Sequence, residues 1–144
     1  MTPRHLPFFL YGTLLPGERN HRLLVGRTVS AAWTPAVLTG ALLFHGPGYP
    51  YAATDPAGTG TVRGEVAVLA EDTYGEALAE LDLLEDYVPG DPANLYERAA
   101  LAVRTEDGDN VTAWVYLAAD RIARELLLSG VRVPDGDWRR RDAR

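Results

Sequence analysis

Cysteine and lysine are both missing from this chain of 144 residues, and histidine occurs only three times. Without cysteine there can be neither a disulfide framework nor a zinc–thiolate site. The histidines are scattered at His5, His21 and His45, without the paired spacing that metal ligands usually show. We therefore expect no metal site. All fourteen basic residues are arginine, which excludes Schiff-base chemistry, pyridoxal phosphate anchoring and a phosphate-loop lysine.

Serine is almost as scarce, because it occurs only at Ser30 and Ser129. Neither position lies in a Gly-x-Ser-x-Gly setting, so an acyl-enzyme mechanism through serine or cysteine is not expected. If the protein is an enzyme, acid–base chemistry by a carboxylate, a histidine or a tyrosine remains.

Long apolar runs are missing as well. No stretch approaches the roughly 20 residues that span a bilayer, and the apolar part of the N-terminal segment is too short for a secretory signal. The net charge is −6, and arginines cluster only in residues 139–144, which we expect to be a frayed tail. These features favour a cytoplasmic protein that binds neither nucleic acid nor a membrane. They do not decide the oligomeric state, which we expect to be a monomer or a homodimer.

The length and a hydrophobic content of 47% fit one domain, residues 1–144. Two helices are expected: one over residues 73–86, begun by a Thr73–Glu76 capping box, and one over residues 120–128. Strand-like segments outnumber helices and do not alternate with them, which predicts an α+β (mixed) domain around a small curled, barrel-like sheet. These segments are residues 6–11, 37–44, 64–70, 96–104 and 111–118.

Two connections in this pattern are informative. The sequence "TEDGDN" separates the last two strand segments and contains an Asp-Gly turn signal, so we expect an antiparallel hairpin there. Residues 45–61 are rich in glycine and proline, and we interpret them as a long loop of the kind that more often shapes a site than merely connects elements.

One carboxylate of the first expected helix points toward the core. At about 100° per residue, the apolar residues of the helix form one stripe, and Glu85 falls inside it. The other acids, among them Asp82, lie on its flanks or beyond, where solvated charges are expected. Loss of hydration raises the pKa of a carboxylate, which would make Glu85 a usable acid or base near neutral pH. Alternatively, the helix frays by residue 84, and Glu85 turns to water or pairs with an arginine such as Arg98.

The predicted hairpin places aromatic and polar residues on one face. Tyr96 and Arg98 share a face of their strand, and Trp114 and Tyr116 share a face of the partner strand. Such a surface is either the wall of a wet pocket or a well-packed sheet face, and the sequence leaves both interpretations open.

Five motifs follow one another between residues 6 and 117. They are "YGTL" after the opening strand, "NHRLL" just beyond it, "GEV" opening a middle strand, "LDLLEDY" closing a helix and "LYERAALAV" after that helix. With these motifs in this order, the sequence resembles the gamma-glutamylcyclotransferase superfamily. It is most similar to the gamma-glutamylamine cyclotransferase branch and to related bacterial enzymes that remove a gamma-glutamyl group from an antibiotic precursor.

The resemblance implies a small mixed α/β domain with a barrel-like sheet and a reaction that needs no metal and no cofactor. In that reaction the free α-amine of a gamma-glutamyl group attacks its own γ-carbonyl, which forms 5-oxoproline and expels an amine. Because the substrate supplies the nucleophile, the missing cysteine, lysine and activated serine would be no handicap. The resemblance also implies the residues of the site. Glu85 is the acid–base residue, and Tyr96 is a second wall. The loop that holds the glutamyl group consists of Tyr11, Gly12, Thr13 and Leu14.

A glycine in this loop would let the backbone approach a ligand closely, and adjacent amides could receive a carboxylate or a developing oxyanion. Asp86 departs from the family pattern, since many relatives have glycine after the catalytic glutamate. The competing hypothesis is a non-catalytic member of the same fold that binds a small anion or a partner protein. A buried acid at Glu85 favours the enzyme, because a binding module has no need for it there.

Overall fold

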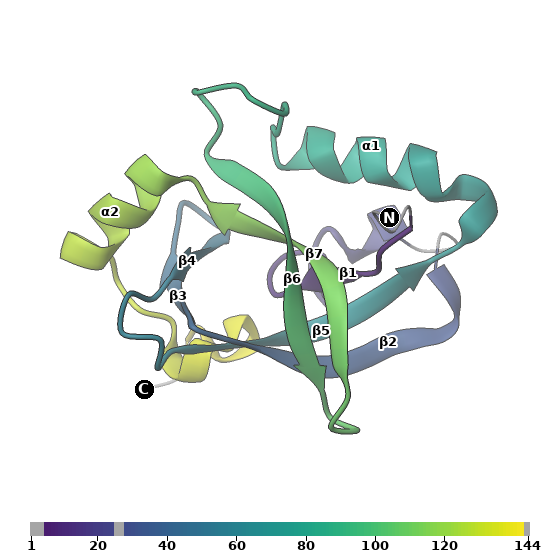
Figure 1. Cartoon of the computed structure of the whole chain (residues 1–144), viewed down its shortest axis with the longest axis horizontal. Helices are drawn as coiled ribbons and strands as arrows, with labels where there is room; N and C mark the ends of the chain where they lie inside the picture. Colours follow the sequence, from purple (N-terminus) through teal and green to yellow (C-terminus); the bar gives the residue numbers. More distant parts are fainter. Residues whose placement is uncertain (1–4, 25–27, 143–144) are drawn as a thin grey trace.

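The chain folds around a closed five-stranded β-barrel (Figure 1). The computed structural model describes residues 5–24 and 28–142. Around the barrel the strand order is β1-β5-β2-β6-β7, and the circle closes where Phe8 of the first strand lies opposite Trp114 of the last. The barrel strands are β1 (Phe8–Leu10), β2 (Thr28–Thr39), β5 (Thr61–Leu69), β6 (Tyr96–Thr105) and β7 (Asn110–Ala118).

The remaining elements surround this barrel. Helix α1 (Tyr74–Leu84) covers one side, and helix α2 (Asp120–Ser129) lies at the other end of the molecule, near a two-stranded sheet of β3 (Ala41–His45) and β4 (Pro50–Thr54) (Figure 1). The short 3-10 helices are η1 (His21–Leu24), η2 (Glu71–Thr73), η3 (Pro134–Gly136) and η4 (Trp138–Arg140). The expected α+β domain with a barrel-like sheet is confirmed. No helix in the described part of the chain is long and apolar enough to cross a membrane.

Alternation along the strands divides the apolar side chains between two cores. Phe9 and Val115 belong to a cluster on the face of the sheet away from α1, and this cluster fills the barrel. Phe8 and Tyr116 point the other way, into a second cluster that also contains the buried side chains of α1. Helix α1 therefore seals the outside of the barrel, and its last turn lies beside the ends of β1 and β7.

The expected hairpin of the last two strands is confirmed, with β6 and β7 paired in antiparallel register from Tyr96 opposite Ala118 to Arg104 opposite Asn110. Two other expectations were wrong. The segment 37–44 is not one strand, because Gly40 turns the chain with a φ of 87° between β2 and β3. Residues 45–61 are not all loop, because they contain β4, whose partner is β3.

The ends of two further segments differ from expectation. Thr73 is the N-cap of α1, but its side chain makes no capping hydrogen bond, so the predicted capping box does not form. The arginine-rich tail is held against the barrel over its described part: Arg139 pairs with Glu65 at 2.8 Å and Arg141 with Glu18 at 3.0 Å. Residues 143 and 144 lie outside the described residues.

Strands β1 and β5 approach each other closely at Gly64. A Cβ atom at this position would lie 2.2 Å from the carbonyl oxygen of Leu10, whereas a Cβ on Gly75 of α1 would meet nothing within 4 Å. We expect Gly64→Ala to lower the free energy of unfolding by about 2–3 kcal/mol, because the strands must separate. Gly75→Ala is the matched control and should raise it by roughly 0.5–1 kcal/mol. Denaturant titration measures both, and equal effects would contradict the close approach.

Candidate active site

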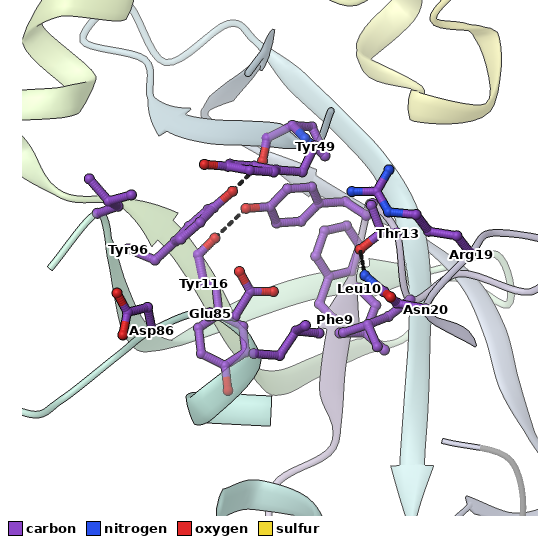
Figure 2. Close-up of a pocket in the computed structure, with 16 residues that line it drawn as sticks. Phe9, Leu10, Thr13, Arg19, Asn20, Tyr49, Glu85, Asp86, Tyr96 and Tyr116 are labelled. Carbon is purple, nitrogen blue, oxygen red and sulfur yellow. Dashed lines mark hydrogen bonds between the residues drawn. The ribbon is translucent and has the colours of Figure 1, made fainter. Parts of the chain in front are cut away.

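A cavity of about 320 Å³ opens between the loop after β1, the C-terminal end of α1 and the start of β6 (Figure 2). Its volume is at the lower end of the roughly 300–1,000 Å³ that small-molecule sites occupy. The structure brings all six of the site residues expected from sequence to the wall of this one cavity: Tyr11, Gly12, Thr13, Leu14, Glu85 and Tyr96. The wall also includes residues that the sequence analysis did not assign to a site, among them Arg19, Asn20 and Tyr49.

The loop after β1 is held in place by Asn20. The backbone N–H of Asn20 donates to the carbonyl of Thr13 at 2.9 Å, and its side-chain amide donates to the Thr13 hydroxyl at 3.0 Å. A Cβ atom on Gly12 would lie 2.8 Å from the ring of Pro50, so only glycine fits between this loop and β4. Within the described residues the N–H groups of Gly12, Thr13 and Leu14 donate to no protein acceptor. These three amides are therefore available to a ligand.

Glu85 follows the last residue of α1, and its carboxylate points into the cavity (Figure 2). The N–H of Glu85 still donates to the carbonyl of Leu81 at 3.0 Å, so its side chain keeps the direction expected from the helical wheel. The alternative pairing with Arg98 was wrong, because that arginine binds Asp82. Burial raises the pKa of Glu85 to about 7, and the negative charge of Asp82 adds to the shift.

The chain turns sharply after Glu85. Asp86 adopts a left-handed conformation with a φ of 53°. The N–H groups of Asp86 and Tyr87 return to the carbonyls of Leu83 and Asp82, at 3.1 and 2.8 Å, which is the Schellman arrangement of a helix end. Glycine is the usual residue at the left-handed position, and in this chain Asp86 occupies it. The turn ends the helix at Leu84, with Glu85 as its C-cap residue, and leaves the Glu85 carboxylate at the cavity wall.

Asp82 anchors this end of the helix to the barrel. One carboxylate oxygen accepts from the Tyr116 hydroxyl at 2.7 Å and from Nε of Arg98 at 2.9 Å, and the other accepts from Nη2 of Arg98 at 3.3 Å. The guanidinium carbon of Arg98 lies 4.3 Å from the centroid of the Trp114 ring. The expectation that Asp82 is a solvated flank residue was therefore wrong. The polar face of the hairpin, with Arg98 among aromatic residues, was the available signal that an acid would pack there.

The hydroxyls of Tyr11 and Tyr96 in the wall are already engaged by the protein. Tyr11 donates to the backbone carbonyl of Tyr116 and accepts from the N–H of Ala52 at 3.4 Å, while Tyr96 donates to the carbonyl of Pro50 at 2.7 Å. Burial raises the pKa of the Tyr11 and Tyr96 hydroxyls far above the ordinary range of a phenol. Both therefore remain protonated donors at neutral pH. The proton-transfer chemistry of the cavity falls to Glu85, whose pKa is close to neutrality.

No group of three or more histidine, aspartate or glutamate side chains that could hold a metal ion occurs within residues 5–24 and 28–142. The site is instead a small cavity with one carboxylate tuned to neutral pH, a loop with unpaired amides and a wall of aromatic rings. Together with the barrel, this arrangement is typical of a small acid–base enzyme or of a pocket derived from one.

The comparisons with known proteins identify the family. Residues 8–140 match the family model described as "Gamma-glutamyl cyclotransferase, AIG2-like", and the chain belongs to that family. It is 34% identical over 110 residues to the gamma-L-glutamyl-butirosin B gamma-glutamyl cyclotransferase of Niallia circulans, an alignment that covers 76% of this chain and 64% of that enzyme. It is also 36% identical over 99 residues to a Halalkalibacterium halodurans protein with the provisional name gamma-glutamylcyclotransferase, covering 69% and 78% of the two chains.

The fold agrees with this assignment. The crystal structure of an AIG2-like protein from Mus musculus superposes with a TM-score of 0.63 at 26% identity, and the match covers 81% of this chain and 79% of that one. The resemblance noted in the sequence motifs is thereby confirmed at the level of family and fold.

The raised pKa of Glu85 makes stability depend on pH. Below about pH 4.5 the carboxyl is protonated in both the folded and the unfolded state, and its effect on stability is neutral. As the pH rises toward 7, the unfolded state ionises first, so the folded state loses stability, by up to about 3 kcal/mol for the full shift. Glu85→Gln should therefore melt higher than the unchanged protein at pH 8 and equally at pH 4. Glu76→Gln, on the exposed face of the same helix, is the control. If the melting temperatures of Glu85→Gln and the unchanged protein differed equally at pH 4 and pH 8, the raised pKa of Glu85 would be contradicted.

Proposed function

We propose that the protein is a gamma-glutamyl cyclotransferase that releases 5-oxoproline and a free amine from a gamma-glutamyl amine or a gamma-glutamyl-tagged small molecule. Family membership supports the general activity. The Niallia circulans relative acts on gamma-L-glutamyl-butirosin B, as its name states. The observation that carries the proposal is the Glu85 carboxylate, which points into a cavity beside unpaired backbone amides and has a pKa of about 7.

The reaction can be written with the residues of this cavity. The substrate α-amine attacks the γ-carbonyl carbon, which forms the ring C–N bond and places negative charge on the carbonyl oxygen. Glu85 removes the proton that the attacking nitrogen gives up and passes it to the leaving nitrogen as the original C–N bond breaks. One proton thus moves between two nitrogens of the substrate, and Glu85 ends in its starting state. Neither a metal nor a cofactor is needed to balance the reaction.

The loop after β1 suits the carbonyl oxygen or the carboxylate of the glutamyl group. The amides of Gly12, Thr13 and Leu14 are unpaired within the described residues, and such donors stabilise a developing oxyanion when they are fixed before the reaction. Asn20 fixes them through its two hydrogen bonds to Thr13. Tyr96, held by Pro50, provides a rigid wall that keeps the flexible glutamyl chain folded toward its own carbonyl.

A pKa near 7 suits both proton transfers of this reaction, the removal of a proton from the attacking nitrogen and its return to the leaving nitrogen. Near neutral pH a carboxylate of this kind is ionised often enough to accept a proton and is acidic enough to return it. An ordinary exposed glutamate, with a pKa near 4.3, would be a much weaker base. The non-catalytic alternative gives no reason to retain a carboxylate in this environment, where its ionisation costs stability. We therefore favour the enzyme.

Glu85→Gln tests the catalytic role. The substitution keeps the shape of the side chain but cannot accept a proton, so turnover should fall by about 10²–10⁴-fold, while binding of a gamma-glutamyl substrate is retained. In the unchanged enzyme, kcat/KM should rise with pH through about 7 as Glu85 ionises. Steady-state kinetics and calorimetric binding measure these effects, with Glu76→Gln as the control. Undiminished turnover in the purified Glu85→Gln variant would exclude the role.

Acetylation of the substrate α-amine tests the intramolecular attack. A gamma-glutamyl substrate with a free α-amine should yield 5-oxoproline, and its N-acetyl counterpart should not react, because the nucleophile is blocked. A hydrolase that activates water would release free glutamate and would accept both substrates. Mass spectrometry of the products on the matched pair separates the two reactions. Glutamate as the product, or equal rates for the pair, would refute the cyclotransferase even if Glu85 were essential.

A further inference from the structure

Arg19 is the one basic side chain among the described residues that line the cavity. Most other arginines near the barrel are engaged: Arg98 binds Asp82, Arg139 binds Glu65 and Arg141 binds Glu18. Within the described residues the guanidinium of Arg19 has neither an ion pair nor a hydrogen-bond partner. Its neighbour in sequence, Glu18, is taken by Arg141 and does not neutralise it. A lone cation therefore faces the site.

The position of Arg19 is well defined by its surroundings. The N–H groups of Glu18 and Asn20, on either side of it, donate to the carbonyls of Leu15 and Thr13 at 2.9 Å each, so its backbone is part of the loop that carries the unpaired amides. Its terminal nitrogens lie 3.8 and 3.9 Å from where a Cβ atom of Gly48 would stand, which places the guanidinium next to the β3–β4 turn. The side chain thus lies at the edge of the cavity where the loop and the turn meet.

Arg19 and Glu85 lie at different depths. Arg19 is exposed, whereas Glu85 is largely buried, with its carboxylate pointing into the middle of the cavity (Figure 2). The bond that breaks must lie next to Glu85, and the unpaired loop amides are available to the glutamyl group. The amine that leaves then extends toward solvent, past the rim where Arg19 lies. Asp86, the other charged residue of the wall, is on the opposite side of the cavity from Arg19 (Figure 2).

We infer that Arg19 is a specificity-determining residue that binds a carboxylate on the leaving amine, so that gamma-glutamyl amino acids are preferred over neutral gamma-glutamyl amines of the same size. This inference rests on the proposed function and adds the chemical class of the leaving group to it. An arginine binds a carboxylate with directed, charge-assisted hydrogen bonds, and it repels a cationic leaving group in the same place. Because the site is at a rim and partly screened by water, the preference should be about three- to tenfold.

A matched pair of probes tests the inference: gamma-glutamylglycine, whose leaving amine carries a carboxylate, and gamma-glutamylglycinamide, whose leaving amine is neutral and of equal size. The measured quantity is the ratio of the two kcat/KM values, with 5-oxoproline as the product. The unchanged enzyme should prefer gamma-glutamylglycine by about three- to tenfold, and 1 M salt should reduce the preference by screening the charge. Arg19→Gln should bring the ratio close to 1, and Arg19→Lys should retain most of it.

Arg124→Gln is the control, since Arg124 is exposed on α2, is absent from the cavity wall and changes the net charge equally. It should keep the ratio of the unchanged enzyme. An equal loss of rate with both probes in Arg19→Gln would overturn the inference, because Arg19 would then act on the glutamyl group itself. Two results with the unchanged enzyme would also overturn the inference: equal rates for the two probes, or faster release of a cationic amine such as ethylenediamine. Those results would still be compatible with the proposed cyclotransferase activity. If no probe yielded 5-oxoproline, both the cyclotransferase activity and the role of Arg19 would be refuted.

Discussion

The attachment of one helix end to the barrel is the constraint on which the site depends. Asp82 accepts three hydrogen bonds, from the Tyr116 hydroxyl on β7 and from two nitrogens of Arg98 on β6, and so ties the last turn of α1 to both strands of the hairpin. Glu85 comes three residues after Asp82, at the C-cap position of the same helix. The Glu85 side chain is oriented toward the cavity by that attachment and by the sharp turn at Asp86, which directs the following chain away from the helix axis.

The same arrangement sets the acidity of the site. Glu85 loses hydration in the cavity, and the nearby charge of Asp82 raises its pKa further, whereas Arg98, which could have lowered it, is bound to Asp82. The fold thus keeps a carboxylate in an environment where its ionisation costs stability. Such a cost is common at functional sites, and the compensation here is the well-packed double core on the two faces of the barrel wall.

The loop and the wall supply what the proposed reaction needs in a chain that lacks cysteine and lysine. The hydroxyls of Tyr11 and Tyr96 donate to backbone carbonyls, so these two side chains act as rigid parts of the cavity wall. The loop contributes backbone amides, and glycine at position 12 is required because Pro50 packs against it. In the mechanism proposed for this cavity, the protein supplies orientation, a proton carrier and charge stabilisation, and the substrate supplies the reacting groups.

Local pattern determined much of this protein by itself. Alternation and the Asp-Gly turn predicted the β6–β7 hairpin, and helical periodicity predicted that Glu85, at the end of α1, points toward the buried side, because both signals depend on residues close together in sequence. The five motifs indicated the family because each is a short local pattern and their order along the chain can be read directly from the sequence. Only the tertiary structure decided that Asp82 pairs with Arg98, that β4 lies within the glycine-rich segment and that Arg19 lies at the cavity rim. These contacts join residues distant in sequence, and a solvated charge and a paired charge look alike until the fold brings their partners together.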